Sequence, residues 1–154
     1  MNSPRTTSPA TVPTTADRLD LITVCSRLGH HVDFREWDRL PALFAPSVLV
    51  RHTGSDTRGE PVPTPRDAVV AQWREARERV LATHHLVTNH LVSVTGDTAT
   101  ATAMFQSTHV VPGESGPRRL ARGGRYVYGF ARTATGWQIT AITIEVLWDD
   151  RTLA

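Results

Sequence analysis

The sequence contains no lysine, a single cysteine and few aromatic residues, which make up 6% of its 154 positions. One cysteine, Cys25, excludes both an intramolecular disulfide and a cysteine-based zinc site. No apolar run approaches the roughly 20 residues that cross a bilayer, and the N-terminal stretch "MNSPRTTSPATVPTT" lacks the apolar centre of a signal peptide. These absences predict a cytoplasmic protein that does not insert into a membrane.

Positive charge is carried by arginine alone, and the net charge is only +2. Four arginines cluster beside the Pro/Gly-rich turn "VPGESGPRR", at positions 118, 119, 122 and 125. This composition is typical of a solvated hairpin end. Because a basic face with interleaved aromatic residues is missing, the sequence does not predict nucleic-acid binding.

The length and a hydrophobic content of 40% suit one domain with a core of its own. Residues 1–15 have the composition of a disordered arm, which leaves residues 16–150 as the domain. A first helix face is formed by Leu21, Cys25, Leu28 and Val32. This spacing predicts a helix over 16–31.

Start signals predict two further helices. Asp33 stands where an N-cap would precede a short second helix in "FREWDRLPALF". In "TPRD", Thr64 is the expected N-cap and Pro65 the first helical residue of a third helix over 65–81.

After residue 84 the hydrophobic period changes from that of a helix to that of a strand. Turn signals at "TGD", "PGESGP" and "TATG" divide this part into four long antiparallel strands, over 84–94, 98–111, 119–132 and 137–148. A short strand, "PSVLVRHT", precedes the loop "GSDTRGEPVP". The prediction is therefore an α+β fold in which three N-terminal helices pack on a strongly curved, mostly antiparallel sheet.

The strand over 98–111 separates into two faces by parity. Ala99, Ala101, Ala103, Phe105, Ser107 and His109 share the face expected to pack against the helices. A face that begins with small residues and ends in Ser107 and His109 suggests a cavity that opens at the His109 end. In the strand before it, one face carries His85 and Asn89 and the other carries His90, and parity alone does not decide which face is inside.

Three segments together resemble a known family. They are "HHVDFREWDRLPALFAPSV", "THHLVTNHLVSVTGDTATATA" and "GGRYVYGFARTATGWQIT". Over residues 16–148 the pattern resembles the SnoaL-like families of the nuclear-transport-factor-like superfamily, near scytalone dehydratase and the small subunits of ring-hydroxylating dioxygenases. The resemblance implies a cone-shaped α+β barrel with a deep pocket at its open end.

The resemblance also implies site residues. Dehydratase-like members use an aspartate at the end of the first helix to hold a strand histidine, and a second histidine from the preceding strand. Asp33, His109 and His85 occupy these places, which implies that Asp33 orients His109 for proton transfer. His85 and Asn89 would then bind a substrate carbonyl, with His84 and His90 facing away.

The sequence also predicts aromatic residues in the pocket. Phe105, Tyr126 and Trp148 are expected to contact the substrate, while Tyr126 and Tyr128 are placed on opposite faces of their strand. Whether Tyr128, Glu145 or His30 faces the pocket is left open. Two histidines and a carboxylate also match a non-haem iron triad, but the resemblance implies acid–base chemistry with no metal and no cofactor.

The predicted function is that of a lyase, isomerase or cyclase, such as a dehydratase or polyketide cyclase. Its substrate would be a polyketide-like or aromatic metabolite of secondary metabolism, as in antibiotic biosynthesis. The alternatives are a non-catalytic small subunit of a ring-hydroxylating oxygenase and a ligand-binding pocket protein. A Thr-rich outer face on the strand over 98–111 predicts a homodimer or homotrimer, because long open strands favour pairing.

Overall fold

The computed structural model describes residues 13–53 and 60–150. Residues 1–12, most of the arm predicted to be disordered, lie outside the described residues. The helix α1 (Thr15–Asp33) begins at the end of that stretch, with Thr14 as its N-cap, and a short 3-10 helix, η1 (Trp37–Leu43), follows it. The first helix predicted from the sequence is confirmed. The capping role predicted for Asp33 is wrong, because Asp33 is the last residue of α1 and Glu36 precedes η1.

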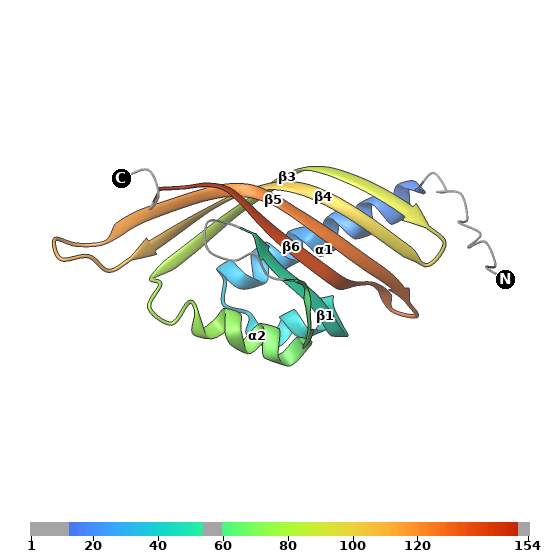
Figure 1. The fold of residues 1–154 in the computed structure, drawn as a ribbon, viewed down its shortest axis with the longest axis horizontal. Helices are drawn as coiled ribbons and strands as arrows, with labels where there is room; N and C mark the ends of the chain where they lie inside the picture. The colour runs from blue at the N-terminus through green and yellow to red at the C-terminus, as the bar shows by residue number, and fades with distance from the viewer. Residues whose placement is uncertain (1–12, 54–59, 151–154) are drawn as a thin grey trace.

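Six strands form one sheet in the order β2-β1-β6-β5-β4-β3. Their bounds are β1 (Phe44–Thr53), β2 (Val62–Pro65), β3 (Ala82–Thr95), β4 (Thr98–Val111), β5 (Arg118–Thr133) and β6 (Gly136–Asp149). Among the strands of the described ranges, only the β1–β6 pair is parallel, so the sheet is mostly antiparallel as predicted. The sheet is strongly curved and stays open, with β2 and β3 as its edges, and α1 and α2 lie under its concave face (Figure 1).

The concave face carries the core. The buried residues on β4 are Ala99, Ala101, Ala103, Phe105 and Ser107, as parity predicted. On β5 the corresponding face carries Tyr128 and Phe130, which pack against apolar residues of α1 and β6. Small alanines on β4 leave room for these large rings on the neighbouring strand, and the helices cover both.

An irregularity in β3 separates its two halves. The register with β4 shifts between Thr88 and Leu91, and Asn89 adopts a positive φ of 55°. Such a bulge inserts a residue and reverses which parity faces inward. Before it His85 and Val87 face the core, and after it Val92 and Val94 do. His90, expected to face away with His84, has the inward parity of Val92, and its Nε2 is buried.

The third helix is shorter than predicted. The helix α2 (Arg66–Glu75) is followed by tight turns up to Val80, and the Leu81 amide then donates to the Val110 carbonyl at 2.7 Å. The guanidinium of Arg35 donates to the carbonyls of Arg77 and Val80, which stabilises this non-helical path. The predicted start was also one residue early, since Pro65 is the N-cap and Thr64 lies in β2, a strand that the sequence did not indicate.

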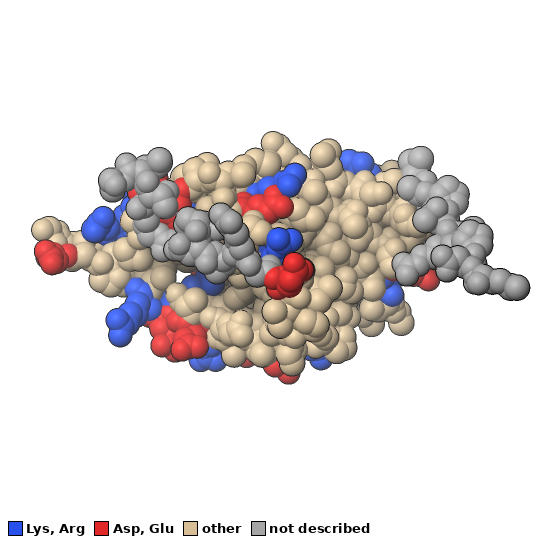
Figure 2. Space-filling model, viewed as in Figure 1, with Lys and Arg blue, Asp and Glu red and all other residues tan. Residues whose placement is uncertain are grey.

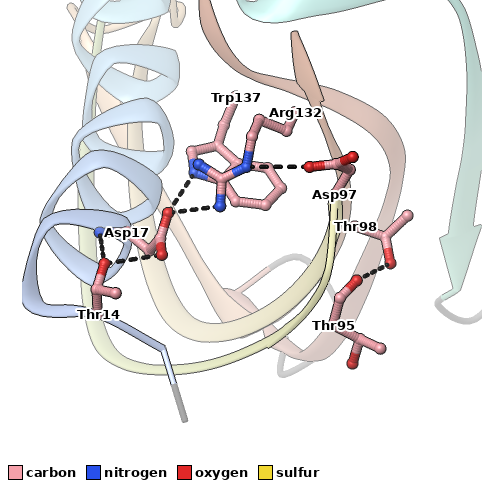
Figure 3. Close-up of polar contacts among 7 residues, drawn as sticks. All are labelled: Thr14, Asp17, Thr95, Asp97, Thr98, Arg132 and Trp137. Atoms are coloured by element: carbon pink, nitrogen blue, oxygen red, sulfur yellow. Dashed lines mark hydrogen bonds and ion pairs between the residues drawn. The ribbon is translucent and has the colours of Figure 1, made fainter. Parts of the chain in front are cut away.

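Polar contacts fix the N-terminal end of α1 to the sheet (Figure 3). Asp17 accepts from the Arg132 guanidinium at 2.8 Å and from Trp137 Nε1 at 3.3 Å, and Arg132 lies over the Trp137 ring at 4.1 Å. Arg132 also reaches Asp97 at 3.4 Å. These contacts join the N-terminal end of α1 to the β3–β4 turn and to both strands of the β5–β6 hairpin.

The surface shows mixed charge rather than a single sign. In the view of Figure 2, acidic and basic side chains are interspersed and gather mainly toward the end from which the β4–β5 hairpin projects. No helix within the described ranges is long and apolar enough to cross a membrane. On the convex face Leu86, Leu91 and Met104 are exposed in the protomer. The homodimer or homotrimer predicted from this face stays a prediction.

Candidate active site

A cavity of about 340 Å³ lies between α1, α2 and the concave face of the sheet. Apolar residues form much of its wall: Leu28, Val32, Trp73, Val87, Ile142 and Ile144. The polar groups in the wall are His52, Gln72, Arg77, His85, Arg122, Tyr126 and Tyr128. A largely apolar cavity with a few convergent polar groups is the usual form of a small-molecule site.

Asp33 and His85 form a hydrogen-bonded pair, in which His85 lines this cavity and Asp33 lines the adjoining groove between α1 and β3. Asp33 Oδ1 lies 2.6 Å from His85 Nδ1, and Asp33 Oδ2 accepts from the His85 backbone amide at 2.7 Å. Thr83 Oγ1 donates to the same carboxylate at 2.8 Å. Both side chains are nearly enclosed, with exposed fractions of 11% for Asp33 and 5% for His85. These bonds orient the ring and leave Nε2 as the nitrogen available to a ligand.

The electrostatics of Asp33 follow from two opposing effects. Burial alone raises the pKa of its carboxyl group, but the hydrogen bonds from His85 and Thr83 and the nearby imidazole outweigh burial and hold the pKa below its usual value. Asp33 is therefore ionised at neutral pH and favours a proton on His85 Nδ1. This is the arrangement in which an imidazole exchanges protons through its other nitrogen.

The predicted pairing of Asp33 with His109 is corrected by this geometry. His85 is opposite Ser107 in the β3–β4 register, and His109 is opposite Thr83, two residues farther toward the β4–β5 hairpin. The C-terminal end of α1 therefore contacts the edge strand β3 at His85. His109 lies next to His85, with ring centroids 6.1 Å apart, but lines a second cavity together with Arg122 and Asp149.

Both tyrosines face the main cavity, so their predicted placement on opposite faces is wrong. Residues two apart on a strand share a face, and Tyr126 and Tyr128 line the cavity side by side, with ring centroids 5.6 Å apart. Burial raises the pKa of Tyr126 to about 12 and raises that of Tyr128 well above its usual value. Both hydroxyls stay protonated at neutral pH and can donate hydrogen bonds.

Three other residues were expected to contact the substrate. Phe105 packs against a cavity residue, whereas Asn89 and Trp148 lie outside the main cavity. Phe105 stacks on Tyr126 with centroids 4.3 Å apart, so it positions that ring from behind. Asn89 is exposed in the β3 bulge, and Trp148 is 39% exposed. Neither of them lines the main cavity.

Two of the three residues left open by the sequence do not face the main cavity. Glu145 forms an ion pair with Arg125 at 2.6 Å, and His30 lines a shallow groove beside α1 and β3. Of these three residues, Tyr128 alone lines the main cavity. In the part of the chain that the structure describes, no three His, Cys, Asp or Glu side chains converge as metal ligands would.

Sequence reasoning missed four polar cavity residues: His52, Gln72, Arg77 and Arg122. Arg122 shares the parity of Tyr126 on β5, and Arg77 follows Trp73 by four residues at the end of α2. Those spacings were the signals that would have identified both. They were overlooked because arginine near turns and helix ends is usually solvated.

The Asp33–His85 contact predicts a pH dependence of stability. The Asp33 carboxyl has a lower pKa in the folded than in the unfolded chain, where a value of about 3.9 is usual. Its contribution is therefore complete above the unfolded value and is lost as the pH falls through the folded value. We expect the stability advantage of the wild type over Asp33→Asn to be constant above about pH 5 and to shrink as the pH falls from there to about pH 3. Urea unfolding of both proteins across this range measures it.

The matched control for this series is Asp20→Asn, which removes an exposed carboxylate from the same helix. Its difference from the wild type should change little with pH. An Asp33→Asn difference that stays constant down to about pH 3 would contradict an ionised Asp33 bonded to His85.

Comparison with known proteins agrees with the fold. The family model of the SnoaL-like domain matches residues 13–143. The Kfla4162 protein from Kribbella flavida superposes with a TM-score of 0.82 at 26% identity, covering 90% of this chain and 95% of that chain. No match was found among curated proteins.

Two similar structures come from Novosphingobium aromaticivorans. A candidate aromatic ring hydroxylase gives a TM-score of 0.75 at 23% identity, covering 89% of this chain and 93% of that chain. A candidate scytalone dehydratase gives a TM-score of 0.74 at 15% identity, covering 87% of this chain and 86% of that chain. At these identities the two likenesses concern the fold alone.

Proposed function

Because the chain belongs to the SnoaL-like domain family, we propose that it is a cofactor-independent lyase, isomerase or cyclase. Its substrate would be a polyketide-like or aromatic metabolite held in the 340 Å³ cavity. The reaction class would be removal of a proton from a carbon next to a carbonyl, followed by loss of water, double-bond migration or ring closure.

The observation that carries this proposal is that His85 lines the cavity while its Nδ1 is bonded to Asp33. His85 Nε2 would accept the proton, and the ionised Asp33 would stabilise the resulting imidazolium. The His85 imidazole is 5% exposed and faces a largely apolar cavity, where low polarity strengthens its electrostatic effect on the substrate.

The tyrosines would supply the complementary stabilisation. An enolate forms when the proton leaves, and the protonated hydroxyls of Tyr126 and Tyr128 line the same cavity as His85. Tyr128 Oη is buried and has no hydrogen-bond partner among the described residues. A buried donor left without a partner is costly, and a substrate oxygen placed there would satisfy it. His109 lines the second cavity beside His85, and in this proposal it is not the base.

Proton abstraction can be tested before the natural substrate is identified. The probe is 2-tetralone, a bicyclic aromatic ketone. In deuterated buffer its C1 hydrogens exchange for deuterium slowly without a catalyst. We expect the protein to accelerate this exchange in a saturable manner, followed by NMR spectroscopy. An exchange rate equal to that in buffer would contradict the proposal.

The alternative is a non-catalytic subunit that supports an oxygenase, because the beta subunit of a candidate aromatic-ring-hydroxylating dioxygenase shares this fold. Stable co-purification with a large iron–sulfur protein, together with no acceleration of exchange, would support this alternative. A ligand-binding protein without chemistry would instead bind 2-tetralone and leave its exchange rate unchanged.

A further inference from the structure

Two arginines from distant parts of the chain meet at the main cavity. Arg77 follows the end of α2 and Arg122 lies on β5, and both line the main cavity and the second cavity beside it. They therefore stand at the boundary between the two hollows. The described lining of the main cavity includes no aspartate or glutamate.

The nearest carboxylates lie outside the lining of the main cavity: Asp149 lines the second cavity together with both arginines, and Asp33 is close enough to favour the charge of Arg77. Arg77 Nη1 donates to the Trp73 carbonyl at 3.1 Å, and Arg122 Nε donates to Ser107 Oγ at 3.4 Å. Arg77 Nε is buried and has no partner among the described residues. A guanidinium presents five donors, and the two bonds named here use one donor of each arginine.

Two like charges in a partly buried site oppose one another. Burial lowers the pKa of Arg77, and the positive charge of Arg122 lowers it further. Burial likewise lowers the pKa of His52, assisted by Arg122 and Arg77, although part of the His52 ring remains accessible. Arginine stays protonated in proteins, and Asp33 offsets part of this cost for Arg77, so a ligand anion between the two side chains would relieve what remains.

We propose that Arg77 and Arg122 bind a carboxylate of the ligand, so that the cavity selects an aromatic acid over its neutral analogue. A planar carboxylate matches the fork of guanidinium donors, and the apolar wall suits an aromatic body. This inference rests on the proposed function for the reaction. It assigns the substrate class, with the acid held by the arginines while a carbon of the same molecule lies near His85.

The test measures binding and needs no turnover. Isothermal titration calorimetry compares 2-naphthoate with 2-naphthamide, which has nearly the same shape and no charge. We expect the wild type to bind the carboxylate roughly 10- to 100-fold more tightly, as hydrogen bonds to charged groups allow. Equal affinity for the two probes, or no binding of either at millimolar concentration, would overturn the proposal.

The variants Arg77→Gln and Arg122→Gln should each reduce this preference, and the double variant should remove it. The matched control is Arg79→Gln, which removes an exposed arginine from the same turn region and should keep the preference. Melting temperatures establish that each variant is folded. A preference that persists in a folded double variant would also overturn the proposal.

The two proposals fail in different ways. If the wild type showed no preference for 2-naphthoate over 2-naphthamide but still accelerated 2-tetralone exchange, the arginine site would be contradicted and the acid–base function would stand. Tight, arginine-dependent binding of 2-naphthoate without any exchange activity would support the arginine site and contradict the catalytic function.

Discussion

Replacing His85 with alanine is expected to lower the rate of 2-tetralone exchange roughly 10²- to 10⁴-fold, the usual range for loss of a general base. His85 lines the cavity, and its Nδ1 is engaged by Asp33 at 2.6 Å, so its Nε2 has no substitute in the same position. The measurement is kcat from the initial rates of deuterium incorporation. Asp33→Asn should reduce kcat less, because the ring stays in place and loses only its charged partner.

Two histidine variants make this result specific. His84→Ala changes the neighbouring exposed histidine, which lies outside the main cavity, and should leave kcat unchanged. His109→Ala tests the assignment first drawn from the sequence, and it should have a smaller effect than His85→Ala. A larger loss in His109→Ala would return the role of base to His109 and contradict the assignment to His85.

The largest expected loss of stability comes from Gly124→Ala. A Cβ at Gly124 would lie 1.9 Å from the Glu145 carbonyl oxygen and 3.0 Å from Phe105 Cε1. Gly124 lies at a register irregularity between β5 and β6. The nearest clash is with a backbone atom, which cannot move aside as a flexible side chain can. We expect the free energy of unfolding to fall by about 3 kcal/mol or more, which urea denaturation measures.

Gly29→Ala is the matched control for the same chemical change. Its Cβ would meet His85 Cβ at 3.4 Å, which is ordinary contact, and Gly29 lies within α1. Because alanine is the better helix former, stability should stay the same or rise by up to about 1 kcal/mol. A Gly124→Ala protein as stable as Gly29→Ala would contradict the close approach of β5 and β6 at this point.

The long meander and the helical layer were predictable because hydrophobic period and turn residues are local signals. The four long strands agree with their predicted ranges to within two residues. The buried face of β4 was identified correctly from alternating alanines. Asp33 and His85 were also identified as site residues, although their roles remain proposals, and Asp33 was paired with His109.

The errors arose where a local rule was interrupted by a neighbour in space. The bulge at Asn89 reverses the parity of β3, so Asn89 became exposed and His90 turned inward. The third helix ends at Glu75 because the chain after it bonds to Arg35 and to β4. Neither contact can be inferred from residues close in the sequence, since Arg35 is separated from Arg77 by 42 positions.

The sequence by itself determined the family, the α+β class, the order of the main elements and the inner face of β4. Only the tertiary structure decided that Asp33 meets His85 and that Tyr126 and Tyr128 share one cavity with Arg77 and Arg122. Periodicity reports which way a side chain points within its own element. The distance between two elements depends on the bulge, the curvature of the sheet and the packing of α1 on β3, which arise from contacts between residues far apart in the chain.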